Sequence, residues 1–211
     1  MLDKIPVELE PKVQALLAQK VPGKLHYSSS VDRGLANLLT CLPWIQEKVP
    51  DTKLHVDVYY GLGNLRIAQP GLAKELEDLI KVAGGEGVVN FKGRVGQQEL
   101  ADAWKKASMW FMPEWFSETY CITSNEAMLS ATPILCSNVA ALETTVGQWG
   151  IRIHGDPYSK ESREKFINEA VKLLTNKDHF EWWARRAFLG SLQGIDWKTR
   201  YENHWKPLLA S

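Results

Sequence analysis

The sequence has little of what marks a secreted, membrane-bound or disulfide-rich protein. Its 211 residues include only three cysteines and no C-x-x-C pair, a usage typical of reduced thiols. No apolar run approaches the ~18 residues that a membrane span requires. Residues 1–13 carry acids and prolines where a signal peptide has an apolar core. We therefore expect a cytoplasmic protein.

An excess of charge of either sign is also missing. Twenty-five basic residues balance 25 acidic ones, so the formal net charge is zero. Nothing in this balance favours binding to nucleic acid or to a membrane surface. The apolar fraction of 45% and the charged fraction of 24% are ordinary for a globular chain, and the length suits one domain with one hydrophobic core.

Several motifs of catalysis and cofactor binding are absent. The sequence contains no P-loop, no H-E-x-x-H, no G-x-S-x-G and no D-x-D pair. Residues 61–66 (GLGNLR) begin like a dinucleotide fingerprint, but Arg66 holds the place of the third glycine, and no helix is expected to begin there. The five histidines are scattered and no Cys/His cluster suggests zinc. We expect neither a metal ion nor a resident cofactor.

What the sequence does contain is an alternation of strands and helices. Strands are predicted at residues 24–30, 53–61, 88–93, 108–113, 133–137 and 149–153. Helices are predicted at residues 33–49, with Asp32 as N-cap, and at 70–83, 97–107, 122–131, 141–147, 161–175, 179–192 and 196–209. Such alternation is typical of βαβ units. It predicts an α/β fold with a single Rossmann-like parallel sheet, helices on both faces and a helical C-terminus.

The chain is expected to divide into three parts. Residues 1–23 are predicted as an N-terminal arm or linker, 24–194 as the Rossmann-like domain, and 195–211 as a helix packing on or across the domain edge. Ligands of such folds bind at the carboxyl ends of the strands. Functional residues are therefore expected just after strands, at residues 28–33, 60–64, 93–96, 113–120 and 137–141.

The segment PEWFSETYCITSNEAM, residues 113–128, carries the most chemical information. The amides of Tyr120, Cys121 and Ile122 fall at a predicted helix N-terminus, which suits an anion such as a diphosphate. Glu118 and Glu126 flank this point. Two carboxylates beside an anion site make sense if they accept hydrogen bonds from the hydroxyls of a ribose and a hexose. Alternatively, both acids only stabilise the positive end of the helix.

At this point the chain resembles a known family. E-x7-E within ETYCITSNEAM, followed by ATPILCSNVAALE, is similar to the donor-binding signature of the family 4, or group 1, retaining glycosyltransferases. HYSSSVDRGLANLL, VNFKGRVGQQEL, WGIRIHGDP and DWKTRYENHW resemble further family segments in the same order. The resemblance covers residues 24–211. It implies the donor-binding half of a GT-B fold and metal-independent transfer of a hexose from a GDP- or UDP-sugar, with retention of configuration.

The resemblance also implies roles for individual residues. Glu118 corresponds to the catalytic-site acid that contacts the donor sugar, Glu126 to the acid that holds the ribose hydroxyls, and Arg33 to a phosphate-binding lysine. The remaining nucleotide-sugar-binding residues implied are Gly93, Arg94 and Val95 at the base, Tyr120, Cys121 and Ile122 at the phosphates, and Ser28 and Ser29 in place of a second basic residue. Cys121 is expected to be structural, although a helix start could lower its pKa, because no base partner is visible.

The family's acceptor-binding domain is not in this sequence. The chain is therefore expected to be a stand-alone donor domain, one subunit of a split enzyme or a truncated piece, and a viral or microbial origin is suspected. A first alternative is a nucleotide-sugar-binding module, inactive alone, that needs a partner protein or self-association. A second is an unrelated doubly wound protein, such as a flavin-type domain. The base, the sugar and the acceptor stay open, with Arg94 favouring GDP slightly.

Overall fold

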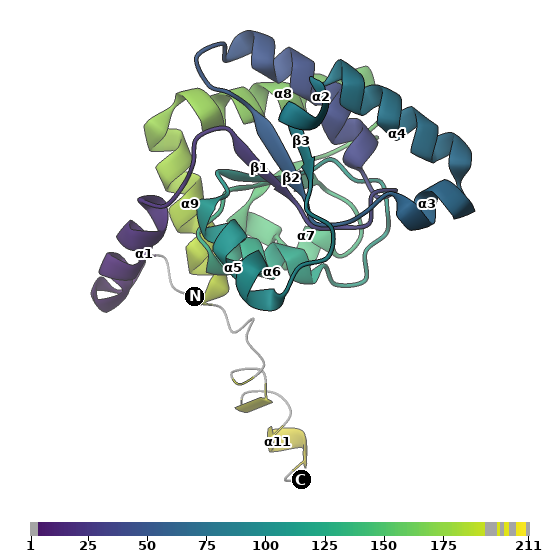
Figure 1. Ribbon diagram of the computed structural model, residues 1–211. Helices are drawn as coiled ribbons and strands as arrows, with labels where there is room; N and C mark the ends of the chain where they lie inside the picture. Colours follow the sequence, from purple (N-terminus) through teal and green to yellow (C-terminus); the bar gives the residue numbers. More distant parts are fainter. Residues whose placement is uncertain (1–3, 193–197, 199–200, 203–205, 210–211) are drawn as a thin grey trace.

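A computed structural model describes residues 4–192, 198, 201–202 and 206–209 (Figure 1). Its centre is a six-stranded, all-parallel sheet in the order β3-β2-β1-β4-β5-β6. This order is that of the doubly wound Rossmann fold. The strands are β1 Lys24–Tyr27, β2 His55–Val58, β3 Val89–Phe91, β4 Met109–Met112, β5 Ile134–Ser137 and β6 Ile151–Ile153. All six predicted strands are thus confirmed, each shorter than predicted.

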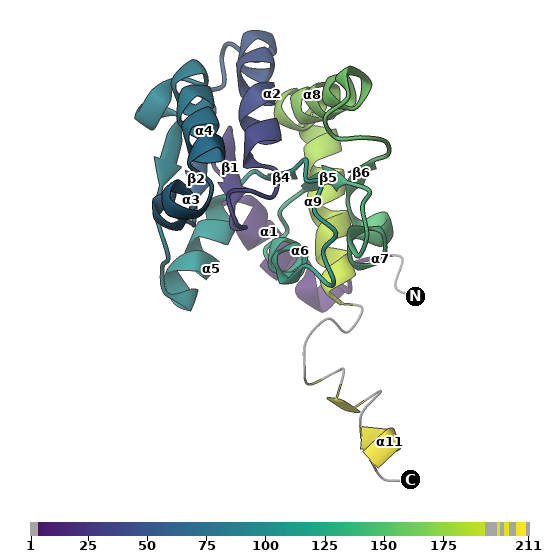
Figure 2. The same ribbon diagram turned by 90° about the vertical axis from the view of Figure 1, so that its right-hand side faces the viewer.

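Helices cover both faces of this sheet, as Figure 2 shows. One layer holds α2 Leu35–Lys48, α4 Pro70–Val82 and α8 Lys160–Thr175, and the other holds α5 Gln97–Lys106, α6 Ile122–Leu129 and α7 Leu142–Thr145. Helix α9, Lys177–Ser191, contacts α8 in the first layer and α6 in the second. Shorter elements are α1 Glu10–Leu17, α3 Gly63–Ala68, α11 Lys206–Leu209, and the 3-10 turns Val7–Leu9, Gly85–Gly87 and Gly147–Trp149. Within the described residues, no helix is long and apolar enough to cross a bilayer.

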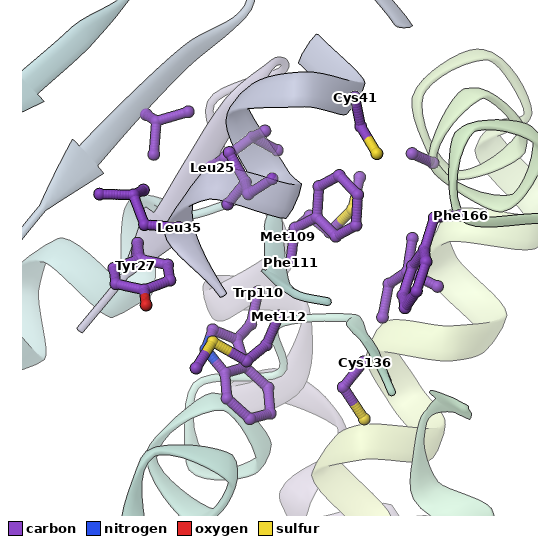
Figure 3. Close-up of a cluster of buried hydrophobic side chains, with 14 of the residues drawn as sticks. Leu25, Tyr27, Leu35, Cys41, Met109, Trp110, Phe111, Met112, Cys136 and Phe166 are labelled. Carbon is purple, nitrogen blue, oxygen red and sulfur yellow. The ribbon is translucent and has the colours of Figure 1, made fainter. Parts of the chain in front are cut away.

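The core lies between the sheet and the two helical layers. Strand β4 is buried on both faces, which explains its uninterrupted apolar sequence. In Figure 3, Phe111 points toward Phe166 of α8, with ring centroids 5.6 Å apart, and Trp110 points to the opposite face. Consecutive side chains of a strand alternate in this way, so β4 supplies large apolar groups to both layers.

The N-terminal segment packs against the domain. Val13 and Leu16 of α1 are buried in a small cluster with Ala131 and Phe188. Glu10 of α1 accepts hydrogen bonds from both terminal nitrogens of Arg185 on α9, at 2.7 and 3.0 Å. Residues 10–17 therefore form a helix docked on α9 by an apolar contact and an ion pair.

Two local predictions are wrong. The first helix begins at Leu35, not after an Asp32 cap, because Gly34 is the N-cap with a φ of +127° and no side chain caps the helix. A helix, α3, does begin at Gly63, since the buried Leu65 anchors it beside α4. The predicted helix at residues 195–211 falls mostly outside the described residues. Within this range, Lys206–Leu209 are described and form the short helix α11.

Candidate functional site

A cavity of about 920 Å³ opens at the carboxyl ends of the central strands. This is the topological switch point, because the chain leaves β1 toward β2 on one side and returns through β4 on the other. Eight of the eleven predicted site residues line it, namely Ser28, Ser29, Arg33, Glu118, Tyr120, Cys121, Ile122 and Glu126. The fold therefore brings together two sequence segments that lie some 85 residues apart.

The three residues predicted at the base do not line this cavity. Gly93 lies in a neighbouring hollow of about 420 Å³, which shares Tyr60 with the main cavity. The guanidinium of Arg94 lies 5.4 Å from the centre of the Tyr60 ring and donates to its hydroxyl at 3.4 Å. Val95 lines neither space. Tyr60, which sequence reasoning placed only in an after-strand segment, is thus the residue that joins the two spaces.

Gly34 lets the two segments of the site approach each other. A Cβ at this position would lie 2.9 Å from the Cα of Glu114, closer than side chains tolerate, and the positive φ also favours glycine. Two hydrogen bonds strengthen the approach. Asn37 of α2 donates to the Pro113 carbonyl at 3.0 Å, and the Trp115 indole donates to the Asp32 carbonyl at 3.2 Å.

An ion pair between two predicted site residues spans the cavity wall. Arg33 Nη1 lies 2.8 Å from Glu118 Oε1, and both side chains are partly buried. The guanidinium carbon also lies 3.9 Å from the centre of the Phe116 ring, within range of a cation–π contact. The positive charge of Arg33 is therefore held at the cavity and balanced by Glu118.

Near this ion pair lies Glu114, which sequence reasoning missed. Its side chain is fully buried, and neither carboxylate oxygen has a hydrogen-bond partner within the described structure. Burial first and the nearby Glu118 second raise the pKa of Glu114 to about 8, against a lowering effect of Arg33. Glu114 is consequently a neutral carboxylic acid at pH 7. Its place directly after an apolar strand was the one available signal.

Helix α6 points its N-terminus at the cavity. Cys121 is the N-cap and has left-handed backbone angles, φ 63° and ψ 77°. Its carbonyl accepts the backbone N–H of Ser124 at 3.2 Å and the Ser124 hydroxyl at 2.8 Å. Burial raises the pKa of the Cys121 thiol to about 12, so the helix start does not lower it. Very little of this thiol is ionised to the nucleophilic thiolate at neutral pH.

Glu126 lies one turn into the same helix. Its Oε2 accepts a hydrogen bond from the indole nitrogen of Trp104 at 3.1 Å. Burial raises the pKa of Glu126, and the Trp104 hydrogen bond counteracts this in part. Glu126 also lines a second cavity, of about 440 Å³, between α1, α5 and α6. Its carboxylate therefore stands at the border of two spaces.

Further lining residues had no signal of their own in the sequence. Besides Tyr60, the main cavity is lined by Ser30, Thr119, Thr123, Asn125 and Leu129. Ser30 and Thr119 lie within segments that the strand pattern selected, whereas Thr123, Asn125 and Leu129 belong to α6. Residues of these types are common in loops and helices of any protein. Among the residues that the structure describes, no group of three or more His, Cys, Asp or Glu side chains could hold a metal ion.

The family model "Glycosyl transferases group 1" matches residues 25–186. This chain belongs to the group 1 glycosyltransferases. The matched residues run from β1 into α9 and include all of the sheet except Lys24, so family membership rests on the same unit that builds the cavity.

Curated relatives of this group 1 chain are similar over part of it. D-inositol 3-phosphate glycosyltransferase of Streptomyces coelicolor is 41% identical over 93 residues, which are 41% of this chain and 20% of that protein. Mannosylfructose-phosphate synthase of Agrobacterium fabrum is 25% identical over 132 residues, 63% of this chain and 28% of that protein. The match thus spans between a fifth and somewhat over a quarter of these relatives' length.

Solved structures agree in fold. The pneumococcal O-GlcNAc transferase GtfA, in complex with UDP and GlcNAc, superposes with a TM-score of 0.69 at 16% identity, over 92% of this chain and 36% of that one. Anabaena HepE in complex with UDP-glucose superposes with a TM-score of 0.68 at 17% identity, over 99% of this chain and 54% of that one. The predicted α/β fold, one Rossmann-like half of a GT-B glycosyltransferase, is confirmed.

Proposed function

We propose that this chain is the donor-binding half of a retaining hexosyltransferase that uses a GDP- or UDP-sugar without a metal ion. The observation that carries this proposal is the arrangement around one cavity of a cation, a helix N-terminus and two carboxylates: Arg33, the start of α6, Glu118 and Glu126. This set matches the chemistry of a nucleoside-diphosphate sugar, which has a dianionic bridge between two groups rich in hydroxyls.

The diphosphate would lie between Arg33 and the N-terminus of α6. A guanidinium grips phosphate oxygens in a bidentate manner, and the helix N-terminus offers backbone amides and a positive dipole end. As the bond from the anomeric carbon to the phosphate oxygen breaks, negative charge grows on the leaving diphosphate. Arg33 and these amides stabilise that charge where it develops.

The two carboxylates would bind hydroxyls on either side of the diphosphate. Glu126 holds the ribose and Glu118 orients the hexose. Retention then follows if the acceptor oxygen attacks from the face that the diphosphate leaves. The new bond from carbon to acceptor oxygen replaces the bond to phosphate oxygen, and the acceptor proton passes to an oxygen of the departing diphosphate. No step needs a metal ion.

A second candidate is a nucleotide-sugar-binding module that transfers nothing without a partner subunit. One observation favours it. A chain from the crystal structure of the GtfA/B complex superposes on this chain with a TM-score of 0.70 at 16% identity, over 90% of this chain and 36% of the matched chain. By its name, that structure contains two different proteins. In both candidates the donor site is the same, and the acceptor is bound by protein beyond this unit.

Calorimetric titration with GDP, UDP, ADP and their common sugars tests the proposal, with Glu126→Ala as control. We expect one nucleotide to bind selectively and the variant to lose that binding, because the ribose hydroxyls lose their acceptor. The chosen nucleotide also names the base. Binding of no nucleotide, or equal binding by the variant, contradicts the proposal. A turnover assay with the chain alone then separates transferase from binding module.

A further inference from the structure

Glu126 is backed by a stack of three aromatic rings. The indole of Trp104, on α5, lies 3.6 Å centroid to centroid from the imidazole of His26, at an interplanar angle of 27°. On the other side of His26 the ring of Tyr59 lies 4.6 Å away, at 21°. At the end of this stack, the Trp104 nitrogen donates to Glu126 Oε2 at 3.1 Å. The stack thus links the centre of the sheet to the cavity.

The stack fixes the indole in place. Trp104 is 2% exposed and His26 is fully buried on β1, the strand at the switch point. The backbone carbonyl of Trp104 also accepts hydrogen bonds from Lys20 Nζ at 3.1 Å and from Thr132 Oγ1 at 3.2 Å. Ring and backbone are therefore both held, and the direction in which the indole N–H points is determined by the fold.

The carboxylate of Glu126, by contrast, has a choice of two spaces. Glu126 and Leu129 line both the main cavity and the 440 Å³ cavity between α1, α5 and α6. A glutamate side chain has enough rotatable bonds to turn into either. Without a fixed donor, nothing in its described surroundings would keep it at the main cavity.

We propose that Trp104 is a positioning residue for donor binding: its indole N–H holds one carboxylate oxygen of Glu126 so that the other faces the main cavity. This inference rests on the proposed function, because it deepens the role of Glu126 at the ribose. The Tyr59–His26–Trp104 stack is the rigid support of that contact. Trp104 itself does not line the main cavity, so it acts through Glu126.

Other charged groups share the two cavities with Glu126 and belong to several elements. Arg33 and Glu118 line the main cavity. Lys12 of α1 and Lys105 of α5 line the second one. Trp104→Phe alters none of these four side chains, and none of them takes part in the hydrogen bond from the indole to Glu126. A change in the titration of Glu126 caused by removing the indole N–H alone is therefore assigned to that hydrogen bond.

The test compares Trp104→Phe with Trp110→Phe. The first variant keeps an aromatic ring beside His26 but loses the N–H. The second makes the same chemical change at a fully buried tryptophan whose nitrogen has no partner in the described structure. The ¹³C carboxyl resonances of the glutamates are followed against pH without ligand. The resonance of Glu126 is the one that is missing from the spectrum of Glu126→Gln. Affinities for GDP, UDP and ADP are measured on the same samples.

We expect Trp104→Phe to move the titration midpoint of Glu126 upward and to weaken nucleotide binding about ten-fold, which equals about 1.4 kcal/mol, with the pH dependence of binding shifted the same way. Trp110→Phe should change neither. An unmoved Glu126 midpoint in Trp104→Phe, or equal losses of affinity in the two variants, overturns the proposal.

A measurement on the wild-type chain keeps the proposal testable if Trp104→Phe fails to fold. One of the nine indole N–H resonances should titrate with the midpoint of Glu126 and shift in Glu126→Gln. If none does, the contact does not exist and the proposal is wrong. These titrations use no ligand. A wild-type chain that binds no nucleotide therefore overturns the proposed function, while the titration still decides whether Trp104 holds Glu126.

Discussion

Replacing the buried Glu114 by glutamine should make the chain more stable at neutral and alkaline pH. Both carboxyl oxygens of Glu114 are buried without partners in the described structure. Burial raises its pKa from 4.5 to about 8 in the folded state. An unfolded chain releases this proton near pH 4.5, but the folded chain keeps it to about pH 8. Folding therefore takes up a proton between these pH values.

The magnitude follows from the difference between the two pKa values. Each pH unit between them costs about 1.36 kcal/mol of stability. The stabilisation of the folded state by the proton on Glu114 is present in full below pH 4.5 and is lost as the pH rises through 8. At pH 7 the loss amounts to about 3 kcal/mol. Glutamine has a similar shape and no proton to release, so Glu114→Gln removes this pH dependence.

Urea unfolding of wild type and variant between pH 5 and 8 measures this difference. We expect the free energies of unfolding to be close at pH 5, and the advantage of Glu114→Gln to grow by about 3 kcal/mol up to pH 8. Glu86→Gln, at an exposed glutamate, is the matched control and should follow the wild type. A constant difference across this range would refute the reasoning, because it would mean that Glu114 ionises normally in the folded chain.

Three more outcomes are expected. Glu118→Ala should weaken binding of the sugar nucleotide but leave the free nucleotide bound at least as tightly, because Arg33 loses its competing partner; equal losses by calorimetry would contradict this. Cys121 should react with iodoacetamide at pH 8 far more slowly than in urea, since burial raises its thiol pKa to about 12; equal rates would contradict its burial. Val13→Ala should lower the free energy of unfolding by about 2 kcal/mol, because Val13 is fully buried against the domain; an unchanged urea midpoint would show that α1 is not part of the folded unit.

The sheet could be predicted from the sequence because its strands are buried. Apolar segments such as 109–112 between helical patterns are a strong local signal, and parallel strands in series leave few possible topologies. The carboxyl ends of these strands then indicate where a site will lie. Eight of the predicted site residues line one cavity for this reason.

The remaining features depend on contacts between distant segments. Gly34 ends up beside Glu114, and Trp104 beside Glu126, only after the sheet has closed. Local sequence preference favours Asp32 as the helix cap. The chain instead needs a glycine at position 34, because the backbone of Glu114 lies against it, and Gly34 becomes the N-cap. The place of Glu114 directly after an apolar strand is a signal for a site residue, but it does not reveal that the side chain is fully buried.

The two halves of the site come together only when β1 pairs with β4 during folding. This pairing involves two residue pairs, Leu25 with Met109 and His26 with Trp110, whereas β1 and β2 share four. The chain from β1 to β3 carries the serines and Arg33, which follow β1, and the chain after β4 carries both acids. If only the part of the chain on one side of the β1–β4 pairing is folded, only part of the site is formed. Ligand binding is therefore coupled in free energy to the joining of the two halves. Any donor that contacts both halves stabilises the pairing of β1 with β4, the shortest in the sheet.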